Sequence, residues 1–247
     1  GVKVLEEDRS LDSYLVAYGE MHRAKLLKLI PSTISISELS KTGVSIIDWG
    51  CGQGVATSVL LDYLAGQVPV RCIRLLEVSN KARNRAIHIV RAYCRSSLAD
   101  IRDIPWIIGK PLMLRDFKLP RNVPIIHLFS NILDVDGLDL ENIATVLNQT
   151  REFGKGYVIA VGPKNPGSEK IEILRKILSA PPPIQQINEF KLEFTNSFSD
   201  KENCTCVGES YLLSQLLRVY QLPEIGQTQT FSLGSTSDVA FGLCPNE

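Results

Sequence analysis

The stretch IIDWGCGQG at residues 46–54 joins an apolar segment to three glycines in alternate positions. The apolar residues predict a buried β-strand that ends at the first glycine. The next residues, VATSVLLDYLAG at 55–66, have helical periodicity. Glycines at such a junction let the backbone pass close to a ligand, and the helix start offers unpaired N–H groups. A simple tight turn needs fewer glycines and no acid before them, so the stretch favours a loop that binds a nucleotide-like cofactor.

Predicted strands and helices alternate along most of the chain. Short β-branched runs predict strands, and apolar residues three to four positions apart predict helices. The predicted strands are 44–50, 70–79, 105–110 (the weakest), 123–133 and 156–164, and the predicted helices are 10–30, 55–66, 80–98, 138–154 and 168–180. This alternation predicts parallel strands with right-handed crossovers, as in a doubly wound sheet.

Local signals refine the ends of these helices. Pro31 is expected to end the first helix, and a break near Gly19 is compatible with its pattern. Asn80 is available as the cap of the helix that it begins. The triple proline at 181–183 is expected to stop the helix before it.

The C-terminal part departs from this alternation. Phenylalanine and leucine alternate with polar residues in EFKLEFTNSF, which predicts a strand. The last sheet strand is expected around 214–222, although a short helix fits almost as well, and an edge strand is expected at 237–243. The predicted fold is α/β: a doubly wound, mostly parallel, seven-stranded Rossmann-like sheet with an N-terminal helical extension and antiparallel C-terminal strands. The expected parts are an extension at 1–40, a Rossmann-like domain at 41–222 and a tail at 223–247.

The composition is that of an ordinary globular protein. The chain has 247 residues, of which 44% are hydrophobic and 22% charged, and its formal net charge is zero. No overall field therefore draws it to nucleic acid or to anionic lipid. Since no apolar run approaches the roughly 18 residues that span a bilayer, no membrane partner is expected. Six cysteines without a secretory signal favour reduced thiols and a cytoplasmic location.

The spacing of the glycines argues against a dinucleotide. A dinucleotide loop has the pattern G-x-G-x-x-G. Counting from Gly50 places Val55 at the third glycine, and counting from Gly52 places Thr57 there. The chain instead carries an acid, Asp48, followed by glycines at alternate positions. A nicotinamide-dependent oxidoreductase is therefore the weaker hypothesis.

Asp48 and the glycines after it resemble the first motif of the class I S-adenosylmethionine-dependent methyltransferases. The resemblance extends over about residues 44–165, and it implies that Glu77, at the end of the next strand, binds the ribose hydroxyls of S-adenosyl-L-methionine. It also implies that Asp48 lies near the amino end of the methionyl group, where a carboxylate suits a cation. The candidate cofactor-binding residues are Asp48, Gly50, Cys51, Gly52, Gln53, Gly54, Glu77, Val78, Ser130 and Asn131.

Two positions depart from the family pattern. Many members have an acid for the adenine amino group where this chain has Lys110, so Asp116 or backbone groups are the alternatives. In HLFSNILDV, Asn131 is followed by Ile132 and Leu133 instead of the prolines of amino-directed nucleic-acid enzymes. The methyl acceptor, whether RNA, DNA, protein or a small molecule, is therefore undetermined, and net charge does not indicate nucleic acid. The alternative function is a non-catalytic methyltransferase-fold binding module within a larger protein.

Other polar residues have structural as well as functional interpretations. No catalytic residue is assigned, and the candidates for a general base are Asp134, Glu20 and His22. Tyr14 and Tyr18 are expected to pack in the core. His88 and His127 are expected to be packed or surface residues. CTC at 204–206 predicts no zinc site. The basic residues of 80–98 predict a solvated helix face.

Overall fold

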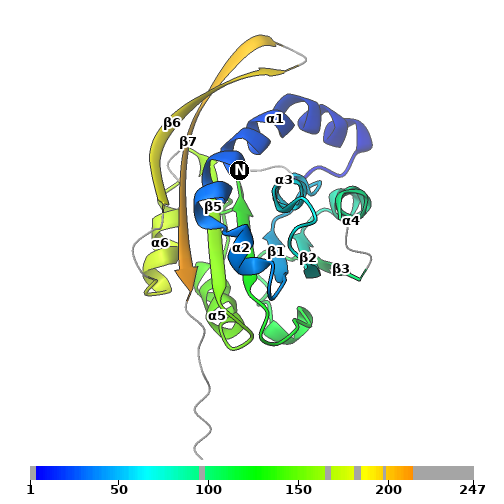
Figure 1. The fold of residues 1–247 in the computed structure, drawn as a ribbon. Coiled ribbons are helices and arrows are strands. Elements are labelled where there is room, and N and C mark those ends of the chain that lie inside the picture. The colour runs from blue at the N-terminus through cyan, green and yellow to red at the C-terminus, as the bar shows by residue number, and fades with distance from the viewer. Residues whose placement is uncertain (1–3, 95–97, 165–167, 181–184, 197–198, 214–247) are drawn as a thin grey trace, which may run out of the picture. The chain divides into compact units, whose positions relative to one another are not determined.

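The computed structural model describes residues 4–94, 98–164, 168–180, 185–196 and 199–213, with backbone alone for 185–205. Seven strands form one sheet in the order β3-β2-β1-β4-β5-β7-β6 (Figure 1). The strands are β1 (Val44–Trp49), β2 (Val70–Glu77), β3 (Asp100–Pro105), β4 (Ile125–Ser130), β5 (Gly156–Pro163), β6 (Gln185–Asn196) and β7 (Ser199–Leu213). β1 to β5 pair in parallel, and β7 pairs antiparallel with both β5 and β6. The predicted fold class is confirmed.

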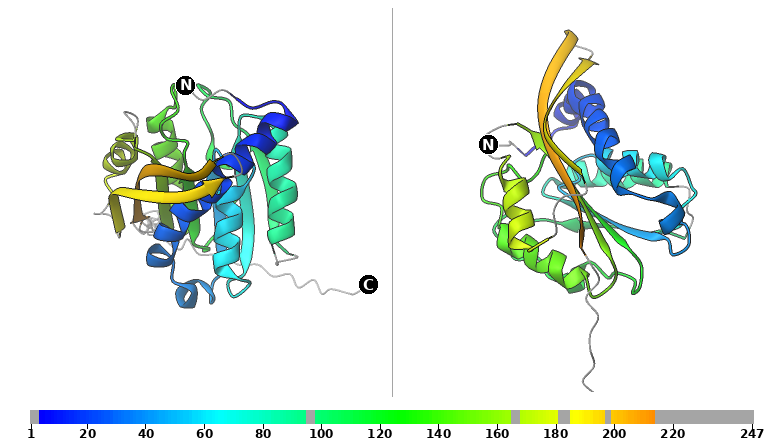
Figure 2. Two further views of the ribbon diagram at one scale, coloured as in Figure 1. Left: turned by 90° about the horizontal axis from the view of Figure 1, so that it is seen from above. Right: turned by 60° about the vertical axis from the view of Figure 1, so that its left-hand side comes forward.

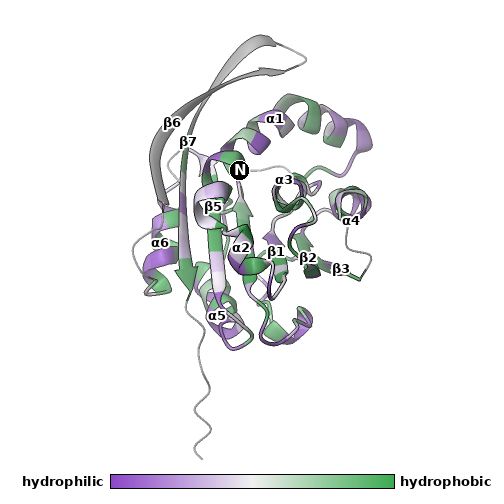
Figure 3. Ribbon diagram, viewed as in Figure 1, coloured by the Kyte–Doolittle hydropathy of each residue, from purple (hydrophilic) through white to green (hydrophobic). Residues whose placement is uncertain are grey.

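Helices cover both faces of this sheet. The helices are α1 (Asp8–Thr33), α2 (Ile36–Leu39), α3 (Val55–Leu64), α4 (Asn80–Tyr93), α5 (Leu140–Thr150) and α6 (Lys170–Ile177), with the 3-10 turn η1 (Leu114–Asp116). Figure 2 shows α1, α3 and α4 on one face of the sheet and α5 and α6 on the other. Each face has its own hydrophobic core, and hydrophilic and hydrophobic residues alternate along the helices because only one side of each is buried (Figure 3).

The connections diverge between β1 and β4, in the middle of the sheet. β1 is buried along its whole length and pairs with β2 on one side and β4 on the other. After β2 the chain continues to β3 on one side of β1, and after β4 it continues to β5 on the other side. The carboxyl ends of β1 and β4 therefore lie where the connections run in opposite directions. Ligands of doubly wound sheets bind at this point.

The N-terminal extension is part of the core. Leu26, Leu29 and Ile30 of α1 are fully buried against residues of α3 and the sheet. The helix runs through Gly19 without a break and includes Pro31 in its last turn. The predicted helix at 10–30 ended three residues too early: proline removes only its own N–H, and Ile34 still donates to the carbonyl of Ile30 at 2.9 Å.

The third strand was placed too late in the sequence. The observed β3 spans Asp100–Pro105, so the predicted strand at 105–110 overlaps it only at Pro105, and residues 106–110 form no strand. β3 is an edge strand, and its exposed Arg102 and Asp103 hide it from a search for apolar runs. The apolar residues after it serve other purposes, since Trp106 packs in the core outside any strand.

Other boundaries also differ. Ser79, and not Asn80, caps α4, because its hydroxyl accepts the N–H of Ala82 at 3.1 Å. The antiparallel strand beside β5 is Ser199–Leu213, and the strand predicted around 214–222 lies outside the described residues, as do the edge strand at 237–243 and the tail. Among the described residues, no helix has the length and hydropathy needed to cross a membrane.

Candidate functional site

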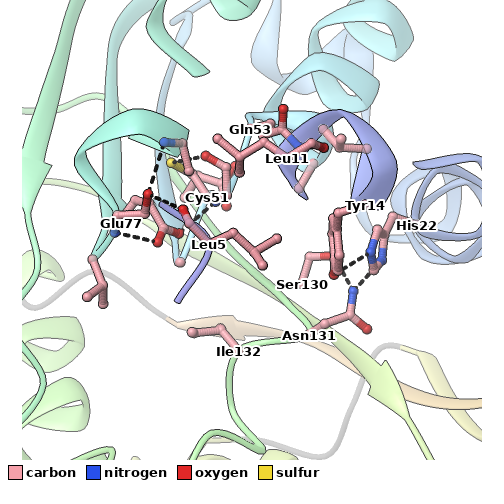
Figure 4. Close-up of a pocket in the computed structure, with 18 of the residues that line it drawn as sticks. Leu5, Leu11, Tyr14, His22, Cys51, Gln53, Glu77, Ser130, Asn131 and Ile132 are labelled. Atoms are coloured by element: carbon pink, nitrogen blue, oxygen red, sulfur yellow. Dashed lines mark hydrogen bonds between the residues drawn. The ribbon is translucent and has the colours of Figure 1, made fainter. Parts of the chain in front are cut away.

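A pocket of about 390 Å³ lies at the carboxyl ends of the central strands (Figure 4). Its volume falls in the range of about 300–1,000 Å³ that is typical of small-molecule and cofactor sites. The loop after β1, the end of β2 and the end of β4 line it, together with α1. Nine of the ten predicted residues line this pocket: Asp48, Gly50, Cys51, Gly52, Gln53, Glu77, Val78, Ser130 and Asn131.

Gly54 is the predicted residue that the pocket lining does not include. It begins α3 with a φ of +85°, and a Cβ atom there would lie 3.3 Å from Ala86 and 3.1 Å from Val90 of α4. Glycine at this position is therefore required by the backbone conformation and by the close approach of α4.

The other two glycines of the loop differ in what surrounds them. A Cβ at Gly50 would lie 2.5 Å from a side-chain carbon of Ile132, whereas a Cβ at Gly52 would have no atom within 4 Å. Both residues have positive φ. The loop is fixed to the neighbouring strand, because the N–H of Cys51 donates to the carbonyl of Leu76 at 2.8 Å. Gly52 therefore borders open space in a loop that is held to β2 and lines the pocket.

Asp48 is fully buried at the end of β1 and lines the pocket. Its Oδ2 accepts two hydrogen bonds from Thr57, from the backbone N–H at 3.2 Å and from the hydroxyl at 2.7 Å. Its Oδ1 has no hydrogen-bond partner among the described residues. Burial raises the pKa of Asp48 to about 7, and the charge of Glu77 adds to this rise while the bonds from Thr57 oppose it.

Glu77 ends β2 beside the glycine loop. Its two carboxylate oxygens accept the backbone N–H groups of Gly52 and Ser79, each at 2.9 Å. Each oxygen of a carboxylate can accept a further hydrogen bond. The carboxylate is thus held in position and retains acceptor capacity on the pocket side.

A chain of four polar side chains closes the other end of the pocket. Figure 4 shows Tyr14, His22 and Asn131 together, across the cavity from Glu77. The hydroxyl of Tyr14 lies 3.0 Å from Nε2 of His22, whose Nδ1 contacts Nδ2 of Asn131. Oδ1 of Asn131 accepts a hydrogen bond of 2.8 Å from Lys25, a fully buried residue of α1.

The pKa values of His22 and Tyr14 are both shifted so that the neutral form of each side chain is favoured. Burial, and then the charge of Lys25, lowers the pKa of His22 to about 3. Desolvation raises the pKa of Tyr14 to about 12, with smaller contributions from Tyr18, Asp134 and Glu77. The imidazole and the phenol are therefore both uncharged at neutral pH.

The start of α1 covers the pocket and is tied to the glycine loop. Leu5, Leu11 and Leu15 line the pocket, and the side chain of Gln53 donates to the carbonyl of Leu11 at 2.7 Å. Gln53 therefore lines the pocket and also anchors the helix. These leucines were not predicted to line a pocket, although the helical spacing of Leu11 and Leu15 beside Tyr14 was a usable signal.

The basic side of α4 is engaged with α1. Arg85 forms ion pairs with Asp8 at 2.9 Å and Asp12 at 2.5 Å, and Lys81 pairs with Asp8 at 3.3 Å. Arg83 pairs with Asp103 of β3. These four ion pairs engage three basic residues of the helix that was predicted to present a solvated face, and of the three the Lys81 side chain is the most exposed.

Several other candidates lie elsewhere. Glu20 is exposed and pairs with Arg23, and Lys110 is exposed. The carboxylate of Asp116 accepts the N–H of Met113 in η1. None of these residues, nor Asp134, is among those that line the pocket.

The remaining polar candidates have structural surroundings. His127 is fully buried between Trp49 and Thr150, and His88 is exposed, as expected of packed and surface histidines. Tyr14 and Tyr18 are 40% and 42% exposed. The prediction that both pack in the core was therefore wrong. In the described part of the chain, no group of three or more His, Cys, Asp or Glu side chains could hold a metal ion.

No protein-family model matches the chain, and no curated protein matches its sequence. Solved structures do match its fold. A precorrin-6y C5,15-methyltransferase from Geobacter metallireducens GS-15 is 13% identical with a TM-score of 0.51, and the match covers 79% of this chain and 88% of that one. A SAM-dependent methyltransferase from Aquifex aeolicus is 14% identical with a TM-score of 0.41, covering 76% and 98%. The N-terminal domain of human METTL16, in complex with SAH, is 14% identical with a TM-score of 0.43, covering 77% and 69%.

At these identities the likeness concerns the fold alone, and only the first match is close enough to support it. In this chain the five parallel strands β1 to β5 are followed by the antiparallel β7 beside β5. The described part of the chain therefore has a Rossmann-like fold similar to that of the precorrin-6y C5,15-methyltransferase.

Proposed function

We propose that the protein is a methyltransferase that uses S-adenosyl-L-methionine and binds it in the pocket after β1. The observation that carries the proposal is Oδ1 of Asp48, a buried acceptor in the lining of a pocket that no described residue hydrogen-bonds. A buried polar atom without a partner is costly, and a bound donor removes that cost. The ammonium of the methionyl group is a donor of suitable charge.

Glu77 and Gly52, two further residues of the pocket lining, support the same cofactor. Glu77 is held by two backbone N–H groups and can accept hydrogen bonds from the two hydroxyls of a ribose. Gly52 leaves open space beside it. We assign the ribose contact to Glu77 and the surface of the glycine loop to the rest of the nucleoside.

The arrangement disfavours a dinucleotide cofactor. In dinucleotide-binding folds a pyrophosphate occupies the N-terminus of the helix after the first strand. Here the N–H of Thr57, in the first turn of α3, is already bonded to the carboxylate of Asp48. A pyrophosphate at this place would meet that carboxylate and Glu77 as like charges.

Methyl transfer from a sulfonium requires that the acceptor atom be held in line with the methyl group, at roughly 3–3.5 Å, with water excluded. We assign the acceptor to the end of the pocket formed by Ser130, Asn131 and Ile132, because this end is opposite Glu77 (Figure 4). The class of acceptor is left to experiment.

Binding comes first in the test. Titration calorimetry should show binding of S-adenosylmethionine and of S-adenosylhomocysteine, and Asp48→Asn should weaken the first by at least tenfold. Asp62→Asn, a change of an exposed carboxylate on α3, is the matched control. Absence of binding by the wild-type protein would refute the proposal.

Turnover is tested separately. The protein is incubated with methyl-labelled cofactor and with separated RNA, DNA, protein and small-molecule fractions of a cell extract. Label in one fraction, lost in Asp48→Asn, identifies the acceptor class. Cofactor binding without label in any fraction would favour the non-catalytic binding module.

A further inference from the structure

The four side chains at the end of the pocket have a fixed direction of hydrogen bonding. Lys25 can only donate, so the atom of Asn131 that it contacts must be the carbonyl oxygen, Oδ1. The amide nitrogen of Asn131 therefore faces His22 and donates to its Nδ1. The same nitrogen also lies 3.3 Å from the hydroxyl of Ser130.

This direction continues through the imidazole to the phenol. A neutral imidazole carries one proton, and since Nδ1 accepts, the proton is on Nε2. Nε2 then donates to the oxygen of Tyr14 at 3.0 Å. The hydrogen of the Tyr14 hydroxyl is left without an acceptor among the described residues, and the side chain lines the pocket.

We propose that Tyr14 donates this hydrogen to the carboxylate of the methionyl group of the bound cofactor, and that His22, Asn131 and Lys25 are positioning residues that keep the hydroxyl in the donating direction. The inference rests on the proposed function, and it adds a specific contact to it.

The charges favour a carboxylate over a neutral acceptor. The chain of hydrogen bonds begins at the ammonium of Lys25, which is fully buried, so each successive donor is polarised towards the pocket. A donor at the end of such a chain is strongest towards an anion. The methionyl group carries its carboxylate on the same carbon as the ammonium assigned to Asp48, another residue of the pocket lining.

The discriminating probe is decarboxylated S-adenosylmethionine, which lacks only the carboxylate. In calorimetry, Tyr14→Phe should weaken S-adenosylmethionine binding by about tenfold or more, because a hydrogen bond to a charged group is lost. Its affinity for the decarboxylated compound should stay within about twofold of wild type.

Tyr18→Phe is the matched control. Tyr18 is on the same helix, its ring centroid is 5.1 Å from that of Tyr14, and it does not line the pocket. This variant should bind both compounds as the wild type does. Equal losses for both compounds in Tyr14→Phe would show that Tyr14 acts through packing and would overturn the proposal.

The positioning role is tested with Asn131→Gly. Asn131 has a φ of +57°, which glycine adopts readily, so the change removes the amide without straining the backbone. In this background, Tyr14→Phe should weaken S-adenosylmethionine binding by no more than about threefold, since the hydroxyl can then turn towards His22. Full additivity of the two changes would rule out the positioning role.

The two proposals fail in different ways. A wild-type protein that binds neither compound refutes the proposed function. A wild-type protein that binds S-adenosylmethionine, and a Tyr14→Phe variant that binds it equally well, refutes the contact alone.

Discussion

Thr57 donates two hydrogen bonds to Asp48, and both reach the same carboxylate oxygen, at 3.2 and 2.7 Å. The second oxygen is buried without a partner in the described part of the chain. A carboxylate so placed is harder to ionise than one in water, and its pKa is about 7. The residue is therefore expected to lower the stability of the protein at neutral pH while it prepares the pocket for a cation.

The first prediction concerns stability and pH. Because the pKa of Asp48 is higher in the folded protein than its usual value of 3.8, the folded state holds a proton that the unfolded chain has released between about pH 4 and 7. Its contribution to stability thus falls as the pH rises through this window. Relative to wild type, Asp48→Asn should gain unfolding free energy on the order of a few kcal/mol between pH 4 and 8. Urea unfolding measures this, and a constant difference would contradict it.

The second prediction concerns ligand binding and pH. The ammonium of S-adenosylmethionine pairs with the ionised form of Asp48, whose pKa in the free protein is about 7. Affinity should therefore increase from pH 5.5 to pH 7, by up to about tenfold per pH unit, and then level off. In Asp48→Asn the affinity should be weak and vary little over this range. Calorimetry in matched buffers tests both expectations, and a wild-type affinity independent of pH would be inconsistent with the assigned contact.

The third prediction compares two glycines. A Cβ at Gly52 or at Gly109 would meet no atom within 4 Å, and both residues have positive φ, but only Gly52 lines the pocket. Alanine at either position should cost a similar amount of stability, about 1 kcal/mol, through backbone strain. Gly52→Ala should also lose at least tenfold in cofactor affinity, whereas Gly109→Ala should keep it. Thermal unfolding and calorimetry separate the two effects, and normal binding by Gly52→Ala would exclude close contact with the loop.

The fourth prediction concerns the cover formed by α1. Arg85 holds the first turns of α1 through Asp8 and Asp12. These pairs are exposed, so Arg85→Met should change the melting temperature little. Hydrogen exchange in residues 8–15 should nevertheless become faster, because the helix start is held by few other polar contacts. Lys176→Met, which removes an exposed pair with Glu172 on α6, is the control and should leave exchange in 8–15 unchanged.

The sequence predicted the centre of this fold better than its edges. β1 and the glycine loop have an unmistakable pattern because the strand is buried on both faces and the loop needs positive φ. β3 was misplaced because an edge strand can be polar. The hydrogen-bonded group of Tyr14, His22, Asn131 and Lys25 was not predicted, since it joins α1 to a residue that lies 106 positions after Lys25. Hydrophobic periodicity indicates which side of a single helix or strand is buried, and it does not indicate which elements far apart in the sequence contact each other.

The fifth prediction concerns the protons of the histidines. The contacts of Asn131 require His22 to be neutral with its proton on Nε2, and its pKa of about 3 keeps it so down to about pH 4. His127 provides an internal reference, because Nε1 of Trp49 can only donate and lies 3.3 Å from Nδ1, which also places the proton on Nε2. In ¹⁵N NMR of histidine-labelled protein, both rings should show a protonated Nε2 and a bare Nδ1 from pH 5 to 7. With three histidines in the chain, His88→Gln and His127→Gln suffice for assignment. A proton on Nδ1 of His22 would reverse the direction of hydrogen bonding and leave Tyr14 without its donating role.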